Sequence, residues 1–227
     1  MNSLSLGNLN KKIINCKKCK RLVSFREKIA KEKRKQYLNE KYWGKPITGF
    51  GDIKGEILLV GLAPAAHGGN RTGRVFTGDR SADFLYKCLY KAKISNQNTS
   101  EKKNDGLKLY NTYITTALKC VPPGDKPTFL ELKTCFKYFR QEIDLLKNIK
   151  VIIALGKIAF DACIEFYKEN YLLKNKDYIF AHAARYQLPD KKILVGCYHP
   201  SPRNVNTKRI NLNMMVKLFK NTKKIIS

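Results

Sequence analysis

The hydrophobic pattern along the chain alternates between short apolar runs and longer amphipathic stretches. Four runs are rich in apolar, β-branched or aromatic residues and are short enough to be buried strands: residues 57–60, 110–118, 151–155 and 193–197. Between and after these runs, apolar side chains recur at the spacing of one helix face. Strands that alternate with helices predict an α/β fold. We therefore expect a single three-layer αβα domain over residues 1–227, built on a central, four-stranded, mostly parallel sheet.

The helical stretches differ in how clearly they begin and end. Asp79 can cap the helix after the first strand, because its carboxylate can accept hydrogen bonds from the first free N–H groups. Thr128 and Glu131 have the spacing of a capping box at the start of the next helix. Residues 22–42 are densely charged and have few apolar positions. This pattern is compatible with either a single helix or a helical hairpin.

The charge of the chain is its most unusual property. Its 45 Lys and Arg against 18 Asp and Glu give a formal net charge of +27. Such a field attracts polyanions, and together with 12 Tyr and 11 Phe it is typical of nucleic-acid binding. A general enrichment of the surface in lysine is the alternative. The distribution is uneven, however, and residues 1–50 form a basic N-terminal segment with 14 basic and 3 acidic side chains.

The sequence shows no sign of a membrane or secretory segment. No apolar run approaches the ~20 residues needed to cross a membrane, and the first residues lack the apolar core of a signal peptide. We expect a cytoplasmic, nucleoid-associated monomer that does not bind membranes. In a reducing compartment, the seven cysteines are expected to be metal ligands or core thiols rather than disulfides.

One loop concentrates the backbone features of a ligand site. Residues 61–79 contain five glycines and one proline and directly follow the first predicted strand. Such a loop lies at the carboxyl edge of a parallel sheet, where open α/β folds bind ligands. An ordinary surface loop is the alternative, but long loops inside compact domains are usually functional. The fourth strand delivers His199 to the same edge, at the root of a turn stiffened by Pro200 and Pro202.

Four cysteines have a spacing that suits a metal site. Cys16 and Cys19 form a C-x2-C pair, and Cys120 and Cys135 follow later with fourteen residues between them. This chemistry allows zinc or an iron–sulfur cluster. Cys135 also fits the apolar face of a helix as a small core residue. The remaining cysteines are expected to be packing residues: Cys88, Cys163 and Cys197.

Two segments of the sequence resemble the signature motifs of a known family. Gly-Leu-Ala-Pro-Ala-Ala-His-Gly at 61–68, with Phe-Thr-Gly-Asp at 76–79, and His-Pro-Ser-Pro-Arg-Asn-Val at 199–205 look like those of uracil-DNA glycosylases. The alanines of the first segment are similar to the type-5 (B-type) iron–sulfur members of thermophilic prokaryotes.

The resemblance implies a monofunctional enzyme of base excision repair. Such an enzyme flips uracil out of double- or single-stranded DNA and hydrolyses its N-glycosidic bond, leaving an abasic site. The resemblance also implies hypoxanthine and xanthine as further substrates. It implies a [4Fe–4S] cluster, with zinc as the alternative, on Cys16, Cys19, Cys120 and Cys135.

The resemblance further implies a role for each motif residue. His199 would polarise the base oxygen that gains negative charge as the glycosidic bond breaks, and Phe76 would stack on the extruded base. The segment after His199 would enter the minor groove and hold the gap open. The expected base pocket comprises Ala63, Pro64, Ala65, Ala66, His67, Phe76, Thr115 and Thr116. The expected DNA contacts are Ser201, Pro202, Arg203, Asn204 and Val205.

The chain departs from the family pattern at two places. Relatives with stringent uracil specificity carry a carboxylate near the position of Leu62 or Ala63 to orient water, and here Asp79 is the nearest substitute. A simple helix cap is the alternative role for Asp79. The asparagine that reads the pairing edge of uracil is replaced by Thr115-Thr116, which predicts a tolerant pocket.

These departures keep a second function open. A catalytically weak, nucleic-acid-binding iron–sulfur protein of the same fold remains the alternative. The glycines also suggest a nucleotide enzyme with a phosphate loop, but the motif G-x4-G-K-[ST] is absent.

Overall fold

The structure, a computed structural model, describes residues 5–226, so that residues 1–4 and 227 of the expected domain lie outside it. The described strands are β1 (Phe50–Gly51), β2 (Ile57–Gly61), β3 (Thr112–Thr116), β4 (Val151–Leu155), β5 (Arg185–Gln187) and β6 (Ile193–Cys197). They form a six-stranded sheet in the order β1-β3-β2-β4-β6-β5. The inner strands β3, β2, β4 and β6 are parallel, and the edge strands β1 and β5 are antiparallel to their neighbours.

The sheet is wider than the sequence pattern predicts. The four parallel strands coincide with the four apolar runs, which confirms the α/β class and the mostly parallel sheet. The expectation of a four-stranded sheet is wrong, because β1 and β5 extend it at its two edges. These strands span only two and three residues. Segments this short carry too few side chains to show an apolar run or an alternation.

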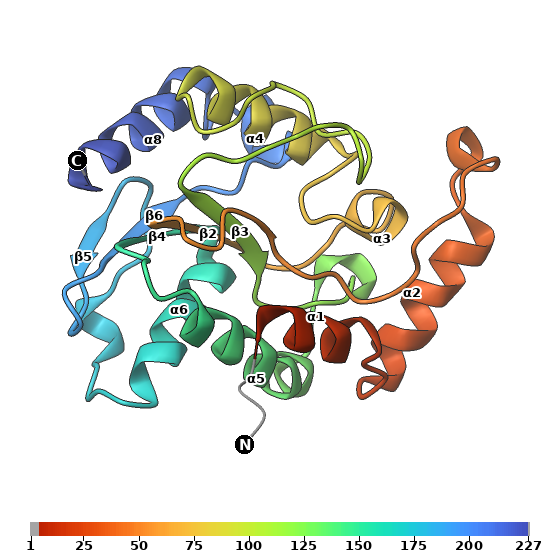
Figure 1. Ribbon diagram of the computed structural model, residues 1–227, viewed down its shortest axis with the longest axis horizontal. Helices are drawn as coiled ribbons and strands as arrows, with labels where there is room; N and C mark the ends of the chain where they lie inside the picture. Colours follow the sequence, from red (N-terminus) through yellow and green to blue (C-terminus); the bar gives the residue numbers. More distant parts are fainter. Residues whose placement is uncertain (1–4, 227) are drawn as a thin grey trace.

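Helices cover both faces of the sheet (Figure 1). On one face lie α4 (Arg80–Lys91) and α8 (Leu212–Ile226), and on the other α5 (Phe129–Leu145) and α6 (Lys157–Lys168), with α1 (Leu6–Ile14) against α5. No helix among residues 5–226 combines the length and the apolar character that crossing a membrane requires.

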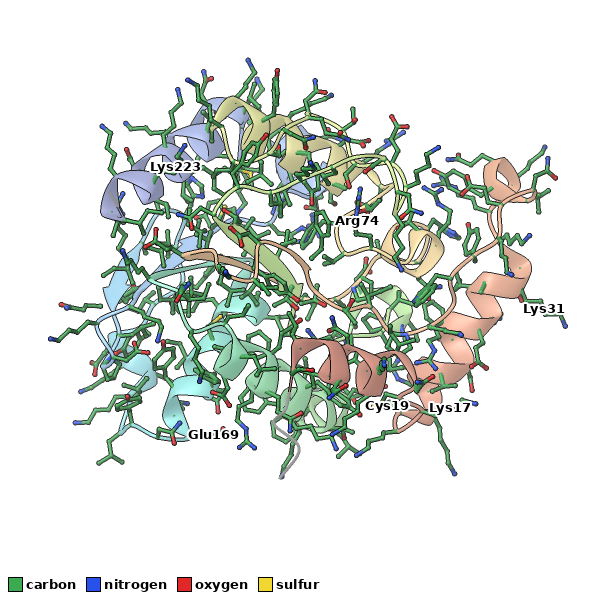
Figure 2. The ribbon with its side chains drawn as sticks, in the orientation of Figure 1. Lys17, Cys19, Lys31, Arg74, Glu169 and Lys223 are labelled. Atoms are coloured by element: carbon green, nitrogen blue, oxygen red, sulfur yellow. The ribbon has the colours of Figure 1, made fainter. Side chains whose placement is uncertain are left out.

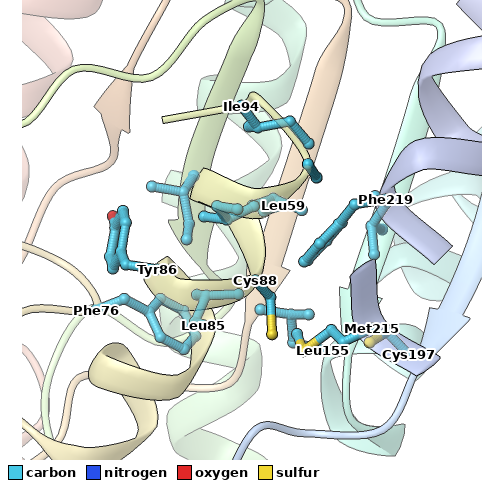
Figure 3. Packing of buried hydrophobic residues seen from close by; sticks show 14 of the residues in the cluster. Leu59, Phe76, Leu85, Tyr86, Cys88, Ile94, Leu155, Cys197, Met215 and Phe219 are labelled. Atoms are coloured by element: carbon cyan, nitrogen blue, oxygen red, sulfur yellow. The ribbon is translucent and has the colours of Figure 1, made fainter. Parts of the chain in front are cut away.

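Each face of the sheet has its own hydrophobic core. Leu59 of β2 packs on the α4–α8 side with Cys88 and Phe219 (Figure 3). Its neighbour Leu58 packs on the α5–α6 side with Phe139. Because successive side chains of a strand point to opposite faces, a strand buried on both faces has a continuous apolar sequence, as β2 does.

The predicted start of α5 is confirmed. Thr128 Oγ1 accepts a hydrogen bond from Glu131 N at 3.2 Å, and Glu131 Oε2 accepts one from Thr128 N at 2.8 Å. This capping box satisfies two N–H groups that a helix end would otherwise leave free, and such a cap contributes about 1 kcal/mol. Four further short helices are α3 (Gly69–Thr72), η2 (Pro123–Asp125), η3 (Asn175–Asp177) and α7 (Pro202–Asn206).

The N-terminal segment is more helical than its polar sequence indicates. Helix α2 (Lys20–Glu32) begins two residues before the stretch 22–42 and ends at Lys33 with φ 56°, and the turn η1 (Lys35–Tyr37) follows it. Helix α1 has only Leu9 and Ile13 as fully buried apolar positions. Both pack in a third core against α5 and the residues that follow β3. Two buried positions are too few for a periodic signal, so the sequence pattern missed this helix.

A buried ion pair joins α5 to β3. The side chains of Glu142 and Lys119 are 0% and 2% exposed, and Lys119 Nζ donates to Glu142 Oε2 at 2.5 Å. The same carboxylate accepts from Thr115 Oγ1 at 2.6 Å, Tyr113 OH at 3.1 Å and Gly49 N at 3.1 Å. Both charges are compensated, which is the condition for burying them at tolerable cost.

We predict that Glu142→Ala lowers the free energy of unfolding by about 3–5 kcal/mol, because it leaves the buried Lys119 ammonium without a counter-ion. Urea denaturation monitored by circular dichroism measures the change. Asp161→Ala, which breaks the exposed Lys157–Asp161 pair, is the matched control and should change stability little. The double variant Lys119→Met/Glu142→Leu should recover most of the loss. An equal effect of Glu142→Ala and the control would contradict the prediction.

Candidate functional site

The loops that follow β2 and β6 meet at the carboxyl edge of the parallel sheet. The ring of Phe76, in the loop after β2, lies 6.2 Å from the ring of His199, which follows β6, measured between centroids. The two rings are tilted by 35° to each other. The structure therefore brings the two sequence motifs together, and we call the region around Phe76 and His199 the candidate centre.

Phe76 is held in an uncommon backbone conformation, with φ 45°. A Cβ on Gly61, at the end of β2, would lie 2.6 Å from the Phe76 ring, so that only glycine leaves room for it. Ser100 Oγ donates to the Phe76 carbonyl at 3.1 Å. Arg74, labelled in Figure 2, donates to Ser100 Oγ and forms a buried, bidentate pair with Asp105. Burial alone would raise the pKa of Asp105, but hydrogen bonds from Arg74 and two backbone N–H groups lower it to about 2.

His199 lies in a partly buried position at the root of a helical turn. Its carbonyl accepts a hydrogen bond from Asn204 Nδ2 at 2.9 Å, and Ser201 Oγ caps α7 by accepting from Asn204 N at 3.3 Å. Burial lowers the pKa of His199, and the Asp125 carboxylate nearby opposes this effect. The imidazole is therefore neutral at pH 7 and carries one N–H group that can donate a hydrogen bond.

The expected DNA-contact segment, residues 201–205, forms the cap and most of the single helical turn α7. Pro202 occupies its first position, which suits proline because that N–H group needs no helical partner. Val205 packs against the α4–α8 core, and Asn204 is used in the internal hydrogen bonds. Arg203 is exposed, and its guanidinium can reach a partner outside the protein.

Asp79 caps α4 and at the same time faces the motif loop, the name we give to residues 62–78 between β2 and α4. Its Oδ1 accepts hydrogen bonds from Ser81 N at 2.9 Å and Ala82 N at 3.0 Å. The other oxygen, Oδ2, lies so close to Gly68 that a Cβ there would be 2.0 Å away. Burial raises the pKa of Asp79, more than the two capping hydrogen bonds lower it. The cap therefore uses one oxygen and leaves the second directed at the motif loop.

The residues between Ala63 and His67 point in different directions. Ala63 packs against the third core, beside the cysteines. Pro64 is buried against Gly69, and Ala66 is half-buried. The Ala65 carbonyl accepts a hydrogen bond from Asn70 N at 3.1 Å.

His67 Nδ1 is hydrogen-bonded to Tyr42 OH at 2.9 Å. His67 and Asp79 line a common cavity together with Arg71. Burial and the charges of Arg34 and Arg71 lower the pKa of His67, which keeps its imidazole neutral.

The two threonines at the end of β3 face opposite sides of the sheet. A Cβ on Gly61 would contact both the Phe76 ring and the Thr116 methyl group, which places Thr116 beside the candidate centre. Thr115 instead accepts from Lys119 Nζ at 2.7 Å and donates to Glu142, on the α5 side. The structure therefore does not bring Thr115 together with the rest of the expected base pocket.

The four candidate metal ligands surround one enclosed cavity. Cys16 and Cys19 precede α2, Cys120 follows β3, and Cys135 lies on α5. No disulfide forms among the described cysteines. In the part of the chain that the structure describes, no group of three or more His, Cys, Asp or Glu residues is placed to hold a metal ion. Burial raises the pKa of Cys120 to about 11 and that of Cys135 to about 12, so metal binding here would release protons.

A buried arginine tests whether this donor set fits a metal centre. Arg26 is 3% exposed, and its Nη1 donates to Cys120 Sγ at 3.1 Å and to the Cys16 carbonyl at 3.3 Å. Its Nε has no hydrogen-bond partner among the described residues, and its ion pair with the exposed Glu27 is long, 3.9 Å. A buried cation needs negative charge nearby. Thiolates bound to a metal centre carry that charge, so Arg26 and the four cysteines fit an anionic centre.

The cysteine cavity and the motif loop are in direct contact. Asn70 Nδ2, in α3, donates to the Arg26 carbonyl at 3.2 Å, and this contact is buried. Arg26, Asn70 and Tyr42 are functional candidates that the sequence analysis missed. Their partners lie 25 to 94 residues away along the chain, and no local spacing indicates such contacts. The other three cysteines are buried in the two main cores, as expected, and Figure 3 shows Cys88 and Cys197.

Comparison with known proteins places this architecture in a family. The family model described as the uracil DNA glycosylase superfamily matches residues 48–223. The chain therefore belongs to the uracil DNA glycosylase superfamily.

Several similar relatives are type-5 uracil-DNA glycosylases. The enzyme of Thermus thermophilus is 41% identical over 92% of this chain and 93% of its own. The enzyme of Mycobacterium leprae is 40% identical over 97% of this chain and 96% of its own. The enzyme of Pyrobaculum aerophilum is 37% identical over 92% of this chain and 88% of its own. The resemblance seen in the two motifs is thus confirmed over nearly the whole chain.

Proposed function

We propose that this chain is a monofunctional uracil-DNA glycosylase of base excision repair, acting as one domain over residues 1–227. It would hydrolyse the N-glycosidic bond of uracil in DNA and leave an abasic site. The observation that carries this proposal is the meeting of Phe76 and His199 at the carboxyl edge of the sheet, in a chain of this superfamily. Relatives of about 40% identity over nearly the whole length are uracil-DNA glycosylases, which supports it.

The reacting bond joins C1′ of the deoxyribose to N1 of uracil. This bond is inside the duplex stack, so the nucleotide must first be flipped out at a cost of a few kcal/mol. As the bond breaks, its electron pair stays on the base, and negative charge develops on the carbonyl oxygens. The neutral His199 donates its N–H to one of these oxygens, and Phe76 stacks on the ring. A water oxygen then bonds to C1′ and loses a proton.

Asp79 would orient this water and accept its proton. The Oδ2 atom is suited to the role, because the cap of α4 uses only Oδ1. A carboxylate next to the sugar also stabilises the positive charge that develops there. Burial raises the pKa of Asp79, so the carboxylate needs a higher pH than usual to be ionised.

The base pocket would accept hypoxanthine and xanthine besides uracil. The motif loop offers small side chains at Ala65 and Ala66, which leave room for a larger base. Thr116 is short, and Thr115 points to the other face of the sheet, so neither can read a pairing edge as an asparagine would. A site without such paired polar contacts discriminates weakly between substrates.

DNA would be held mainly by charge. The net charge of +27 favours contacts with phosphates, and the α7 segment, residues 201–205, would present Arg203 to the minor groove. Double-stranded and single-stranded DNA would both bind, since neither of these contacts depends on base sequence.

The cysteine cavity would hold a [4Fe–4S] cluster bound by Cys16, Cys19, Cys120 and Cys135. Four cysteine thiolates are the ligand set that such a cluster takes. The four thiols line one cavity, which supplies the number of thiolates that such a cluster needs, and zinc remains the alternative. When bound, the cluster would cross-link the segments that carry the four cysteines, and Arg26 would compensate its charge while its carbonyl binds the motif loop.

The test of the proposed function is a set of duplexes containing uracil, hypoxanthine, xanthine or a thymine mismatch, incubated with the purified protein and then cleaved with alkali. Strand cleavage at uracil is expected. His199→Ala should slow base release about a hundred- to a thousand-fold, the usual effect of losing one such donor, with DNA affinity nearly unchanged. DNA binding without any cleavage would favour a catalytically weak DNA-binding protein of this fold.

The variant Asp79→Asn should separate the two roles of this side chain. Asparagine is a competent helix cap, so the melting temperature should stay the same. The single-turnover rate should fall strongly, because the negative charge is gone. In the unaltered protein, activity should rise with pH through a pKa above the usual ~3.9 of aspartate, and this rise should be missing from Asp79→Asn. An unchanged rate would leave Asp79 as a cap only.

The purified protein should be brown, with broad visible absorption that bleaches on reduction. Replacing Cys16, Cys19 or Cys120 by Ala should abolish the colour, whereas Cys88→Ala, which changes a core thiol, should keep it. The visible absorption of the Arg26→Met variant should decay faster in the presence of a chelator, because the positive charge that compensates the cluster is lost. A colourless protein with one zinc per chain would overturn the cluster assignment.

A further inference from the structure

Two large apolar side chains stand exposed next to each other at the start of α5. Phe129 is 80% exposed and Leu130 is 70% exposed. Scattered single apolar residues on a surface need no explanation. An adjacent aromatic–leucine pair with nearly full exposure does, because it costs solubility unless something covers it.

The loop that carries this pair leaves the sheet at the same edge as the candidate centre. The pair lies at the end of the loop that follows β3, and β3 is the parallel neighbour of β2. The carboxyl ends of these strands meet at one edge, so the loop lies beside the motif loop. Asp125, in the same loop, is near enough to His199 for its charge to act on the imidazole.

The loop presents the pair in a fixed shape. Pro122, Pro123 and Pro127 stiffen its backbone. Gly124 and Asp125 follow each other with φ 59° and 57°, a tight turn. Two anchors come from α2. Arg21 donates to both carboxylate oxygens of Glu131 at 2.7 Å, and also to the Lys126 carbonyl at 3.1 Å.

The surroundings of the pair suit a polyanion with exposed aromatic faces. Lys126 and Lys133 flank it and are exposed. When a nucleotide is flipped out of a duplex, the neighbouring bases lose a stacking partner and expose apolar faces. Aromatic and aliphatic side chains fill such gaps, and aromatic rings stack on any base regardless of sequence.

We propose that Phe129 and Leu130 form a second apolar wedge, which packs against the bases next to the flipped nucleotide while the α7 segment enters from another side. The inference rests on the proposed function, because it names a further DNA contact of the same site. It gives the loop between Cys120 and Cys135 a role in binding duplex DNA.

The test compares two double variants by fluorescence anisotropy with duplexes that carry an abasic analogue or no lesion. Phe129→Ala/Leu130→Ala removes the wedge. Tyr171→Ala/Leu172→Ala removes a matched pair that is 40% and 106% exposed. The control pair lies beyond the far end of α6. This helix begins after Gly156, beside His199, and its 12 residues span about 18 Å.

The wedge variant should bind the abasic duplex about five- to a hundred-fold more weakly, the usual range for losing one stacked base. Its salt dependence should keep the same slope, since apolar contacts release no counterions. The control variant should bind as the unaltered protein does. The single variant Phe129→Trp keeps an aromatic ring and should bind with the affinity of the unaltered protein. The fluorescence of the new indole should be quenched by the DNA.

Equal affinities of the wedge variant and the unaltered protein would overturn the inference, and so would equal losses in both double variants. A sedimentation mass that falls in the wedge variant would show instead that the pair joins two copies of this chain, which also overturns it. Because binding is measured without base release, a protein that excises no uracil but loses affinity in the wedge variant would refute the proposed activity and leave the wedge standing.

Discussion

The ion pair between Lys119 and Glu142 is the constraint on which the geometry of this protein depends. It is fully buried and ties α5 to the end of β3, the strand whose exit leads to both Cys120 and the loop of Phe129. The same carboxylate holds Gly49 and thereby the chain segment that enters the sheet. A buried charge tolerates displacement poorly, because any loosening leaves an ion without a partner in an apolar region. The network therefore fixes α5, the end of β3 and the segment of Gly49 relative to one another.

The cysteine cavity and the candidate centre are two parts of one arrangement. Arg26 contacts Cys120 through its guanidinium and Asn70 through its carbonyl, so a single residue of α2 touches both the cysteine cavity and the motif loop. Ala63 of the motif loop packs directly against the core that contains the cysteines. A metal centre in this cavity would take no part in bond breaking. Its loss would weaken the packing that supports the motif loop at Ala63 and Asn70.

The sequence predicted those features that are carried by local patterns. The four parallel strands, the capping box at Thr128 and the convergence of Phe76 with His199 all follow from apolar runs, short spacings and strand direction. The edge strands and α1 escaped prediction because they offer too few side chains for a pattern. The direction of Thr115 depends on a carboxylate 27 residues away. The partners of Arg26 and Tyr42 depend on packing between distant segments, which no local spacing records.

The contacts that fix α2 have a consequence for how the chain assembles during synthesis. Arg21 binds Glu131, 110 residues later, and Arg26 binds Cys120, 94 residues later. At ribosomal speeds of about 5–20 residues per second, the N-terminal helices wait roughly 5 to 20 s before their partners have been made. During that interval Cys16 and Cys19 are open to oxidants and to any available metal ion. Helix α2 is thus made well before the residues of α5 and of the loop after β3 that hold it in place.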